Sequence, residues 1–181
     1  MIEIRIHGRG GGGAVTSAKL LALAAISEGK YAVAFPSFGP ERRGAPVLAF
    51  VKVDKQPIRV RSEIQEPDVV LVLDPSLLCV VDVTAGLKKT GIIIVNSRKE
   101  PSEMKADFAG PWKFATVNAL AIARDVIGVP IVNTTMMGAL AKCTGVVGLE
   151  SLGEAIREVF GARAAKNITA CHRAFEETVV I

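Results

Sequence analysis

The sequence predicts an α/β protein: one three-layer domain over residues 1–181, with a mostly parallel sheet, an antiparallel hairpin and helices on both faces. Three observations predict this fold class. Short apolar runs rich in β-branched residues, such as Val69–Leu73 and Ile92–Val95, are typical of strands buried on both faces. Segments with helical spacing alternate with these runs, which favours a parallel sheet covered by helices. No repeat, linker or low-complexity tract divides the 181 residues, a length that suits one domain.

The chain begins with a strand, a glycine-rich loop and a helix. Ile2, Ile4 and Ile6 alternate with polar residues, a period of two that predicts a strand with one buried face. Apolar residues throughout Ala14–Glu28 predict a largely buried helix. The loop between them, Gly8–Gly13, has the spacing G-x-G-x-x-G in the strand-loop-helix context that gives this pattern meaning. Because the N–H groups at the start of a helix favour an anion, we expect a phosphate or another negative group at this loop.

A second strand and a hairpin are expected next. Tyr31–Phe35 predicts a short strand, and the Pro- and Gly-rich stretch 36–46 is too irregular for a helix or a strand. Val47–Val53 and Ile58–Ser62 flank the connection Asp54–Pro57, an arrangement that predicts a β-hairpin. This hairpin would add antiparallel strands to an otherwise parallel sheet.

The rest of the chain predicts short elements and then helices. Ser76–Val81 predicts a short helix between the two central runs, Lys99–Pro111 is polar and irregular, and Phe114–Val117 predicts a short strand. Four helices follow, with boundaries set by Asn caps, a capping box that begins at Ser151, and Gly or Pro at the ends. They are expected at Asn118–Ile127, Asn133–Cys143, Ser151–Phe160 and Arg163–Val179.

Composition narrows the class of partner. Apolar residues make up 50% of the chain, yet no apolar run approaches the ~18 residues of a membrane span. The excess suits either a well-filled core or surface that is buried against other subunits. The N-terminus has no basic and apolar leader, so we expect a cytoplasmic protein without membrane association. A net charge of +4 permits an anionic ligand, while the absence of interleaved basic and aromatic residues argues against nucleic acid.

Cysteine and histidine offer no catalytic set. Cys79, Cys143 and Cys171 are far apart in sequence, form no C-x-x-C motif and are expected to be reduced thiols. His7 and His172 are expected to be packed or surface residues, although His7 adjoins the glycine loop and could line its ligand. We therefore assign no catalytic residue and no metal ligand to this chain.

The glycine loop completes neither of the common nucleotide-binding motifs. A P-loop needs Lys and then Ser or Thr after its last glycine, where this chain has Ala14-Val15. A dinucleotide site needs Asp or Glu at the end of the second strand, which here ends at Phe35-Pro36-Ser37. Two interpretations stay open. The loop is either a tight turn whose glycines allow close packing, or a ligand-facing segment in which the site residues are Arg9, Gly10, Gly11, Gly12 and Gly13.

A second charged loop is the other candidate. Glu41, Arg42 and Arg43 lie between Gly39-Pro40 and Gly44-Ala45-Pro46, which restrict the backbone on both sides. Arg makes bidentate contacts with carboxylates and phosphates, so this cluster is either an anchoring loop or a solvated turn. Asp74 stands at the carboxyl end of a strand, where α/β proteins place ligand groups, but is more simply a cap for the turn that follows.

The two loops carry a family resemblance. His7–Thr16 resembles the loop that opens the gamma subunit of the 2-oxoacid:ferredoxin oxidoreductases, and Ala34–Val47 is similar to that family's second hallmark. The family pattern has Gln where this sequence has Gly12, so a side-chain amide is lost while the backbone groups of the loop stay available. The similarity extends along essentially the whole chain, through Pro57-Ile58-Arg59, Glu66-Pro67-Asp68, Asp74–Leu78, Pro130–Thr134 and Lys166-Asn167-Ile168.

The resemblance implies a subunit of a multi-subunit enzyme of the pyruvate:ferredoxin oxidoreductase or pyruvate synthase type. Such enzymes oxidatively decarboxylate a 2-oxoacid with coenzyme A, give an acyl-CoA and reduced ferredoxin, and can run in reverse. The implied partners are alpha, beta and ferredoxin-like delta subunits, with ferredoxin as the electron acceptor. The chain is not expected to be active alone.

The implied cofactors are thiamine diphosphate, magnesium and iron-sulfur clusters. This chain has no clustered cysteines and no G-D-G with a downstream Asn-Asn, so we expect these groups on partner subunits. The glycine loop and Glu41–Arg43 are then expected to help hold coenzyme A or the substrate carboxylate. Two alternatives stay open: the same family acting on 2-oxoglutarate or a branched-chain 2-oxoacid, and a stand-alone nucleotide-binding or structural module.

Overall fold

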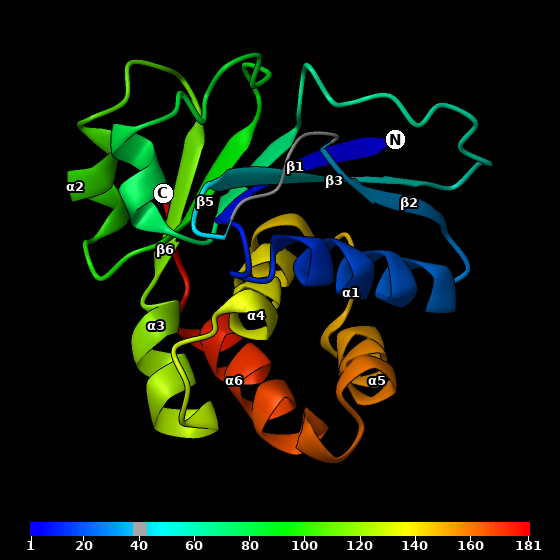
Figure 1. The fold of residues 1–181 in the computed structure, drawn as a ribbon. Coiled ribbons are helices and arrows are strands. Elements are labelled where there is room, and N and C mark those ends of the chain that lie inside the picture. The colour runs from blue at the N-terminus through cyan, green and yellow to red at the C-terminus, as the bar shows by residue number, and fades with distance from the viewer. Residues whose placement is uncertain (38–42) are drawn as a thin grey trace.

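A computed structural model describes residues 1–37 and 43–181 and contains one seven-stranded sheet (Figure 1). The strand order is β2-β3-β1-β4-β5-β6-β7. The pairings of β1 with β4, β4 with β5 and β5 with β6 are parallel, whereas β3 is antiparallel to both β1 and β2, and β7 to β6. The strands are β1 Ile2–Arg9, β2 Tyr31–Pro36, β3 Pro46–Asp54, β4 Val69–Val72, β5 Ile92–Asn96, β6 Lys113–Val117 and β7 Val179–Val180.

Alternating side chains on the central strands feed two hydrophobic clusters, one on each face of the sheet. On β4, Val69 and Leu71 belong to the larger cluster, whereas Val70 and Val72 belong to the smaller one. Successive side chains of a strand point to opposite faces, so both faces of this run must be covered by protein. The observed mixed sheet with helices on both faces confirms the predicted fold class.

The larger cluster lies between the sheet and helices α1 and α4, with α5 and α6 on the far side of these two helices (Figure 1). Helix α4 is buried along most of its length and approaches α6 closely at Gly138, where a Cβ would lie 1.9 Å from the Cys171 carbonyl oxygen. Contact this close explains a glycine in mid-helix. The helices of this face are α1 Ala14–Ser27, α3 Ala119–Ile122, α4 Asn133–Thr144, α5 Leu149–Phe160 and α6 Ala164–Glu177; a π-helical turn at Ala123–Ile127 extends α3, and a 3-10 turn at Gly161–Arg163 precedes α6.

The opposite face carries much less helix. A 3-10 helix, η1 (Pro75–Cys79), and the short α2 (Pro101–Lys105) contribute Leu77 and Met104 to the smaller cluster. Their sheet partners in this cluster come from β4, β5 and β6. The half of this face that is formed by β1 and β3 is therefore covered by other segments of the chain.

The prediction that residues 58–62 form a hairpin with β3 is wrong. Residues 58–62 form no strand, and β3 pairs instead with β2, in a register that places Tyr31 opposite Asp54. Because β1 and β2 occupy both edges of β3, no edge is left for the later segment. The first strand also differs from its prediction, since Arg5 and His7 on its polar face are buried too.

Several helix boundaries also differ. Residues Pro101–Lys105 within the expected irregular stretch form α2. Helix α5 starts before the predicted capping box, because the Glu28 carboxylate accepts hydrogen bonds from Gly148 N at 2.6 Å and from the Ser151 hydroxyl at 2.5 Å. Asn133 is the first residue of α4 rather than its cap. None of the helices in the described part of the chain is long and apolar enough to cross a membrane.

Candidate functional site

The glycine loop lies where neighbouring strands send the chain to opposite faces of the sheet. After β1 the chain enters α1 on the larger-cluster face, whereas after β4 it enters η1 on the other face. Strands β1 and β4 are parallel neighbours, so both connections leave from the same end of the sheet. Ligands of open α/β sheets bind in the crevice at such a position, outside the carboxyl ends of the strands.

The loop is a tight turn that depends on glycine. Gly12 N donates to Arg9 O at 2.7 Å, and Gly11 and Gly13 have φ of 81° and 88° in the left-handed region. A Cβ on Gly13 would lie 2.8 Å from the Asn133 Cβ. A Cβ on Gly12 would lie 2.9 Å from Arg9 O, so this turn closes most easily with glycine at that position.

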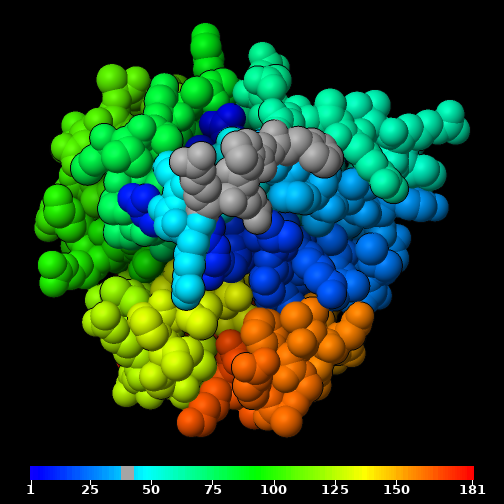
Figure 2. Space-filling model, viewed as in Figure 1, coloured from blue at the N-terminus to red at the C-terminus, as the bar shows by residue number. Residues whose placement is uncertain are grey.

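The two motifs singled out from the sequence come together here. Gly10 N donates to Ala45 O at 2.9 Å, and Gly44 N donates to Gly10 O at 3.0 Å. Arg43 forms a parallel bridge with Gly10 and its side chain is exposed. On the surface, the segment that follows residue 42, cyan in Figure 2, lies against the blue N-terminal segment. Of the second motif's predicted site residues, Glu41 and Arg42 lie outside the described residues.

Arg9 braces this arrangement rather than standing free. Its Nε donates to the Asp74 carboxylate at 2.9 Å, its Nη2 to the Ser76 hydroxyl at 2.7 Å and its Nη1 to Gly44 O at 2.9 Å. Asp74 also caps η1, as predicted, by accepting from Ser76 N. Partial burial acts to raise the pKa of the Asp74 carboxyl, but hydrogen bonds from Ser76 and Arg9 bring it below its ordinary value. The Arg9–Asp74 pair was not predicted from the sequence.

A pocket of about 380 Å³ opens beside the loop, and we call it the glycine-loop pocket. Asn96 and Ile131 line it although sequence reasoning missed them as site residues. The Asn96 amide donates to Leu73 O at 2.9 Å and accepts from Leu120 N at 3.3 Å, so it ties β4 and β5 to the start of α3. A polar residue that ends a fully buried strand is the signal that could have found it. The lining residues are Arg9, Gly11, Gly12, Leu73, Asp74, Pro75, Asn96, Leu120, Pro130, Ile131 and Val132.

The topology argues further against a dinucleotide site. In the dinucleotide-binding fold the second strand lies beside the first, so that its terminal carboxylate reaches the ribose. Here β3 lies between β1 and β2. The end of β2 at Pro36 is thus displaced from the glycine loop by one strand.

The cysteines and His7 stand apart from the glycine-loop pocket. Burial raises the pKa of the Cys143 and Cys171 thiols to about 12, so neither supplies a thiolate, and Cys79 is exposed. Among the described residues no group of three or more His, Cys, Asp or Glu side chains could hold a metal ion. His7, expected to be a packed or surface residue, is buried with its side chain in a different pocket, beside Arg5.

Known proteins are similar to this chain, in sequence and in structure, over almost its whole length. Residues 3–179 match the family described as Pyruvate ferredoxin/flavodoxin oxidoreductase. The chain is 58% identical to the Pyruvate/ketoisovalerate oxidoreductases common subunit gamma of Thermococcus kodakarensis, over 99% of this chain and 98% of that protein. It is 50% identical to the Pyruvate synthase subunit PorC of Methanothermobacter thermautotrophicus, over 98% and 96%. The crystal structure of pyruvate oxidoreductase subunit PORC from Thermotoga maritima superposes with a TM-score of 0.87 at 36% identity, over 99% and 97% of the two chains.

Proposed function

Because this chain belongs to the pyruvate ferredoxin/flavodoxin oxidoreductase family as a gamma subunit, we propose that its glycine-loop pocket completes the site for coenzyme A or the 2-oxoacid. The assembled enzyme oxidatively decarboxylates a 2-oxoacid, foremost pyruvate, to an acyl-CoA and passes the electrons to ferredoxin. Its other subunits are an alpha, a beta and a ferredoxin-like delta chain.

Partner subunits supply the cofactors in this proposal. Thiamine diphosphate with its magnesium ion and the iron-sulfur clusters need clustered thiolates or oxygen ligands. The three cysteines of this chain are separated, with Cys171 in the core between α4 and α6 and Cys79 at the surface. The residues described here do not fit a cluster or a metal centre, so this chain's part is to bind and position.

One observation carries the assignment of the site: the backbone pairing of the two motif loops. The bridge between Gly10 and Arg43 sets the second loop next to Gly11, which lines the pocket at the carboxyl ends of β1, β4 and β5. The first turn of α1 begins there, with its N–H groups free of intrahelical partners. The exposed Arg43 adds a positive charge next to Gly11, where a Cβ would lie 4.0 Å from the Arg43 Cγ. Backbone donors and an arginine together suit phosphate or carboxylate oxygens.

Steady-state kinetics of the complex reconstituted with Arg43→Ala tests this proposal. We expect KM for coenzyme A or for the 2-oxoacid to rise about tenfold, since charge-assisted hydrogen bonds contribute about 1.5–3 kcal/mol. Arg157→Ala, which removes an exposed arginine of α5, is the control for the change in charge. If both KM values match the wild type in Arg43→Ala, that residue does not belong to the site.

A second substrate is favoured by the known role of one relative. The Thermococcus kodakarensis protein is a subunit common to pyruvate and ketoisovalerate oxidoreductases. We therefore propose that this chain also serves an enzyme for branched-chain 2-oxoacids, with 2-oxoglutarate as the remaining alternative. Complexes that copurify with the untagged chain from native cells should turn over both pyruvate and 2-oxoisovalerate. Recovery of a single complex that acts on pyruvate alone would contradict the shared role.

A further inference from the structure

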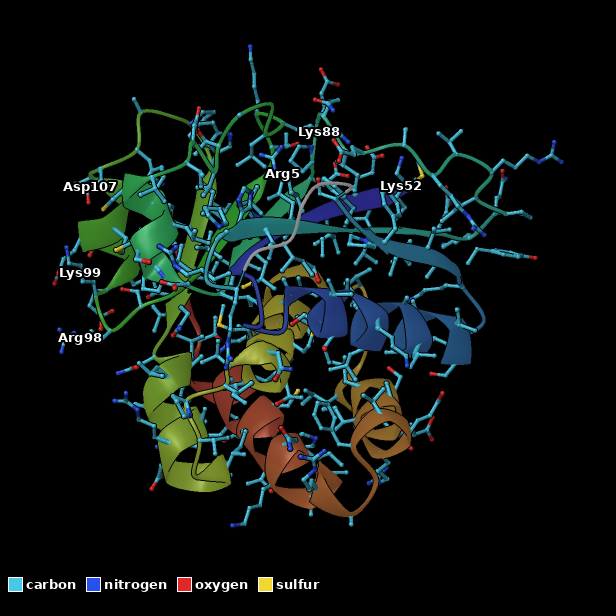
Figure 3. The ribbon with its side chains drawn as sticks, viewed as in Figure 1. Arg5, Lys52, Lys88, Arg98, Lys99 and Asp107 are labelled. Carbon is cyan, nitrogen blue, oxygen red and sulfur yellow. The ribbon has the colours of Figure 1, made fainter. Side chains whose placement is uncertain are left out.

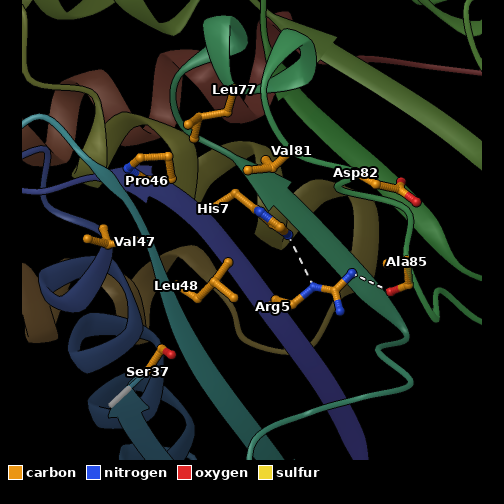
Figure 4. A pocket seen from close by; sticks show the side chains of 10 residues that line it. All are labelled: Arg5, His7, Ser37, Pro46, Val47, Leu48, Leu77, Val81, Asp82 and Ala85. Carbon is orange, nitrogen blue, oxygen red and sulfur yellow. Dashed lines mark hydrogen bonds between the residues drawn. The ribbon is translucent and has the colours of Figure 1, made fainter. Parts of the chain in front are cut away.

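A second pocket lies on the sheet face opposite α1 and α4, over β1 and β3 (Figure 4). Its volume is about 470 Å³, and we call it the Arg5 pocket. Pro46, Val47 and Leu48 form one wall and Leu77 and Val81 the opposite one, while Arg5, His7, Asp82 and Ser37 supply the polar groups. Ligand pockets typically have this combination of apolar walls and a few convergent polar groups.

Arg5 is a buried charge with unused hydrogen-bonding capacity. Its side chain lies on β1 and is 7% exposed. Nε donates to His7 Nε2 at 3.1 Å, and Nη2 donates to Val83 O at 3.0 Å and Ala85 O at 2.6 Å. A guanidinium has five N–H donors. Within residues 1–37 and 43–181, Nη1 has no hydrogen-bond partner and no carboxylate forms an ion pair with the group.

His7 lines the pocket beside Arg5 and adds no charge to it. It is 5% exposed, and burial together with the positive charge of Arg5 lowers its pKa to about 4. The ring is therefore neutral at pH 7. Because Nε2 accepts from Arg5, the proton lies on Nδ1, on the side of the ring away from Arg5.

Lys52, a second buried cation on this face, has an acidic partner of the kind that Arg5 lacks. Lys52 on β3 is 4% exposed and lies 3.3 Å from the Glu3 carboxylate. Lys88 extends that pairing to Asp68 at 2.8 Å. Arg5, Lys52 and Lys88 all lie on the sheet face away from α1 and α4 (Figure 3). Buried charges are normally paired, so the Arg5 guanidinium lacks the counter-charge that Lys52 has.

The nearest acidic group does not supply that counter-charge directly. Asp82 lines the pocket, but its carboxylate accepts from the Thr84 hydroxyl at 2.7 Å and from Thr84 N at 2.9 Å. Its charge also disfavours a ligand with two negative charges. The apolar walls disfavour inorganic anions, which bring no surface to bury there.

We propose that the Arg5 pocket binds an organic monocarboxylate with an aliphatic body, its carboxylate on Arg5 and its chain between Leu48 and Val81. The carboxylate belongs either to a small molecule or to an acidic side chain of a partner subunit; the chemistry of recognition is the same. This site is separate from the glycine-loop pocket and does not rest on the function proposed for that pocket.

Isothermal titration of the full chain with 4-methylvalerate tests the proposal. We expect saturable binding of the carboxylate, with the neutral 4-methylvaleramide and inorganic phosphate each binding at least about tenfold more weakly. Arg5→Gln should abolish the binding. Lys52→Met removes a buried cation from the same face and should leave the affinity unchanged, which controls for a general loss of positive charge.

Val81→Trp keeps the proposal testable if Arg5→Gln fails to fold. The larger side chain fills the pocket from the segment after η1 and leaves the hydrogen bonds of Arg5 in place, so 4-methylvalerate binding should be lost. Absence of saturable binding to the wild type, equal binding of the amide or of phosphate, or binding that survives Val81→Trp would overturn the proposal.

The assembled complex then separates the two sources of the carboxylate. A site that stays open to 4-methylvalerate in the complex takes a small molecule. A site that binds it in the isolated chain and loses it on assembly is filled by an acidic side chain of a partner, and mixing the partner subunits with Arg5→Gln should then weaken assembly. Binding to the isolated chain supports the proposal in both cases.

Discussion

The glycine-loop pocket and the Arg5 pocket both border η1, through Pro75 and Leu77, and are built in different ways. The first is shaped by backbone: turns at Gly11 and Gly13, a bridge from Gly10 to Arg43, and helix and strand ends. The second is shaped by side chains that project from the middle of β1 onto a sheet face and are covered by the segment after η1. Both include residues of β1 or its continuation.

This difference explains why one site can be recognised in the sequence and the other cannot. A backbone site that needs a positive φ, as at Gly11 and Gly13, favours glycine and so leaves a trace in the sequence. A side-chain site on a strand leaves only an alternation of polar and apolar residues, which any half-exposed strand also shows. Substitutions in the glycine loop should therefore destabilise the protein through backbone strain. The Arg5 pocket should instead be sensitive to pH and to changes in charge.

The largest effect is expected at Gly13. In Gly13→Ala the new Cβ meets Asn133 at 2.8 Å and the residue must keep φ of 88°. We expect a loss of about 3 kcal/mol in the free energy of unfolding, measured by urea denaturation. Gly29→Ala is the control, because φ is 77° but nothing lies within 4 Å, and it should cost about 1 kcal/mol. Equal losses in the two variants would show that the contact with Asn133 is not the cause.

The next effect concerns His7 and pH. Its folded pKa of about 4 lies below the ordinary value of 6.5, so the unfolded chain binds a proton first as the pH falls. Stability is complete above 6.5 and declines as the pH falls toward 4, by about 2 kcal/mol between pH 7 and pH 5. His7→Gln retains an acceptor for Arg5 but does not titrate. Urea denaturation of this variant should show a decline smaller by that amount, and an unchanged decline would mean that another group is responsible.

A smaller effect is expected at Arg9. Arg9→Met removes the donors to Asp74, Ser76 and Gly44, and because the pair is partly exposed we expect a loss of about 1 kcal/mol. The pKa of Asp74 should rise toward its ordinary value, as measured by NMR titration of its carboxyl. Since a lowered pKa stabilises the fold only while the carboxylate is ionised, the difference from wild type should shrink as the pH falls through the pKa of Asp74. A pKa that stays in place would contradict the bracing role.

The smallest effect on stability is expected at the rim of the glycine-loop pocket. Ile131 is 48% exposed, so Ile131→Ser should change the free energy of unfolding by less than about 0.5 kcal/mol. If the pocket holds coenzyme A, KM for coenzyme A should rise in the reconstituted complex. Val129→Ser is the control, since that residue is similarly exposed and lies outside this pocket. Equal KM values in the two variants would show that Ile131 does not belong to the site.

The sequence predicted most elements because their signals are local. The β-branched runs that form β4 and β5 and the glycine loop between β1 and α1 can each be recognised within about ten residues. The role of Asp74 as a cap is equally local. The wrong predictions concern segments whose structure depends on residues that are distant in the sequence. Residues 58–62 have strand-like composition, but no free strand edge is available to them, and the start of α5 is fixed by Glu28 from another helix.

The candidate site divides in the same manner. Arg9–Gly13 and Glu41–Arg43 were predicted as one site from two motifs, and the structure brings Gly10 and Arg43 into contact. Asn96 and Ile131 were missed because each joins the pocket through the packing of strand and helix ends rather than through a motif. The Arg5 pocket was missed because the polar face of β1 was expected to meet solvent, whereas the segment from Leu77 to Ala85 covers Arg5 and His7.

By itself, the sequence determined the fold class, the family and the position of the glycine loop, because periodicity and backbone freedom are properties of short segments. The tertiary structure decided which strand lies beside which, which loops meet at the rim of the glycine-loop pocket, and which charges are buried. Those outcomes depend on the competition for strand edges and on what covers each face of the sheet, and both are settled only when the whole chain packs.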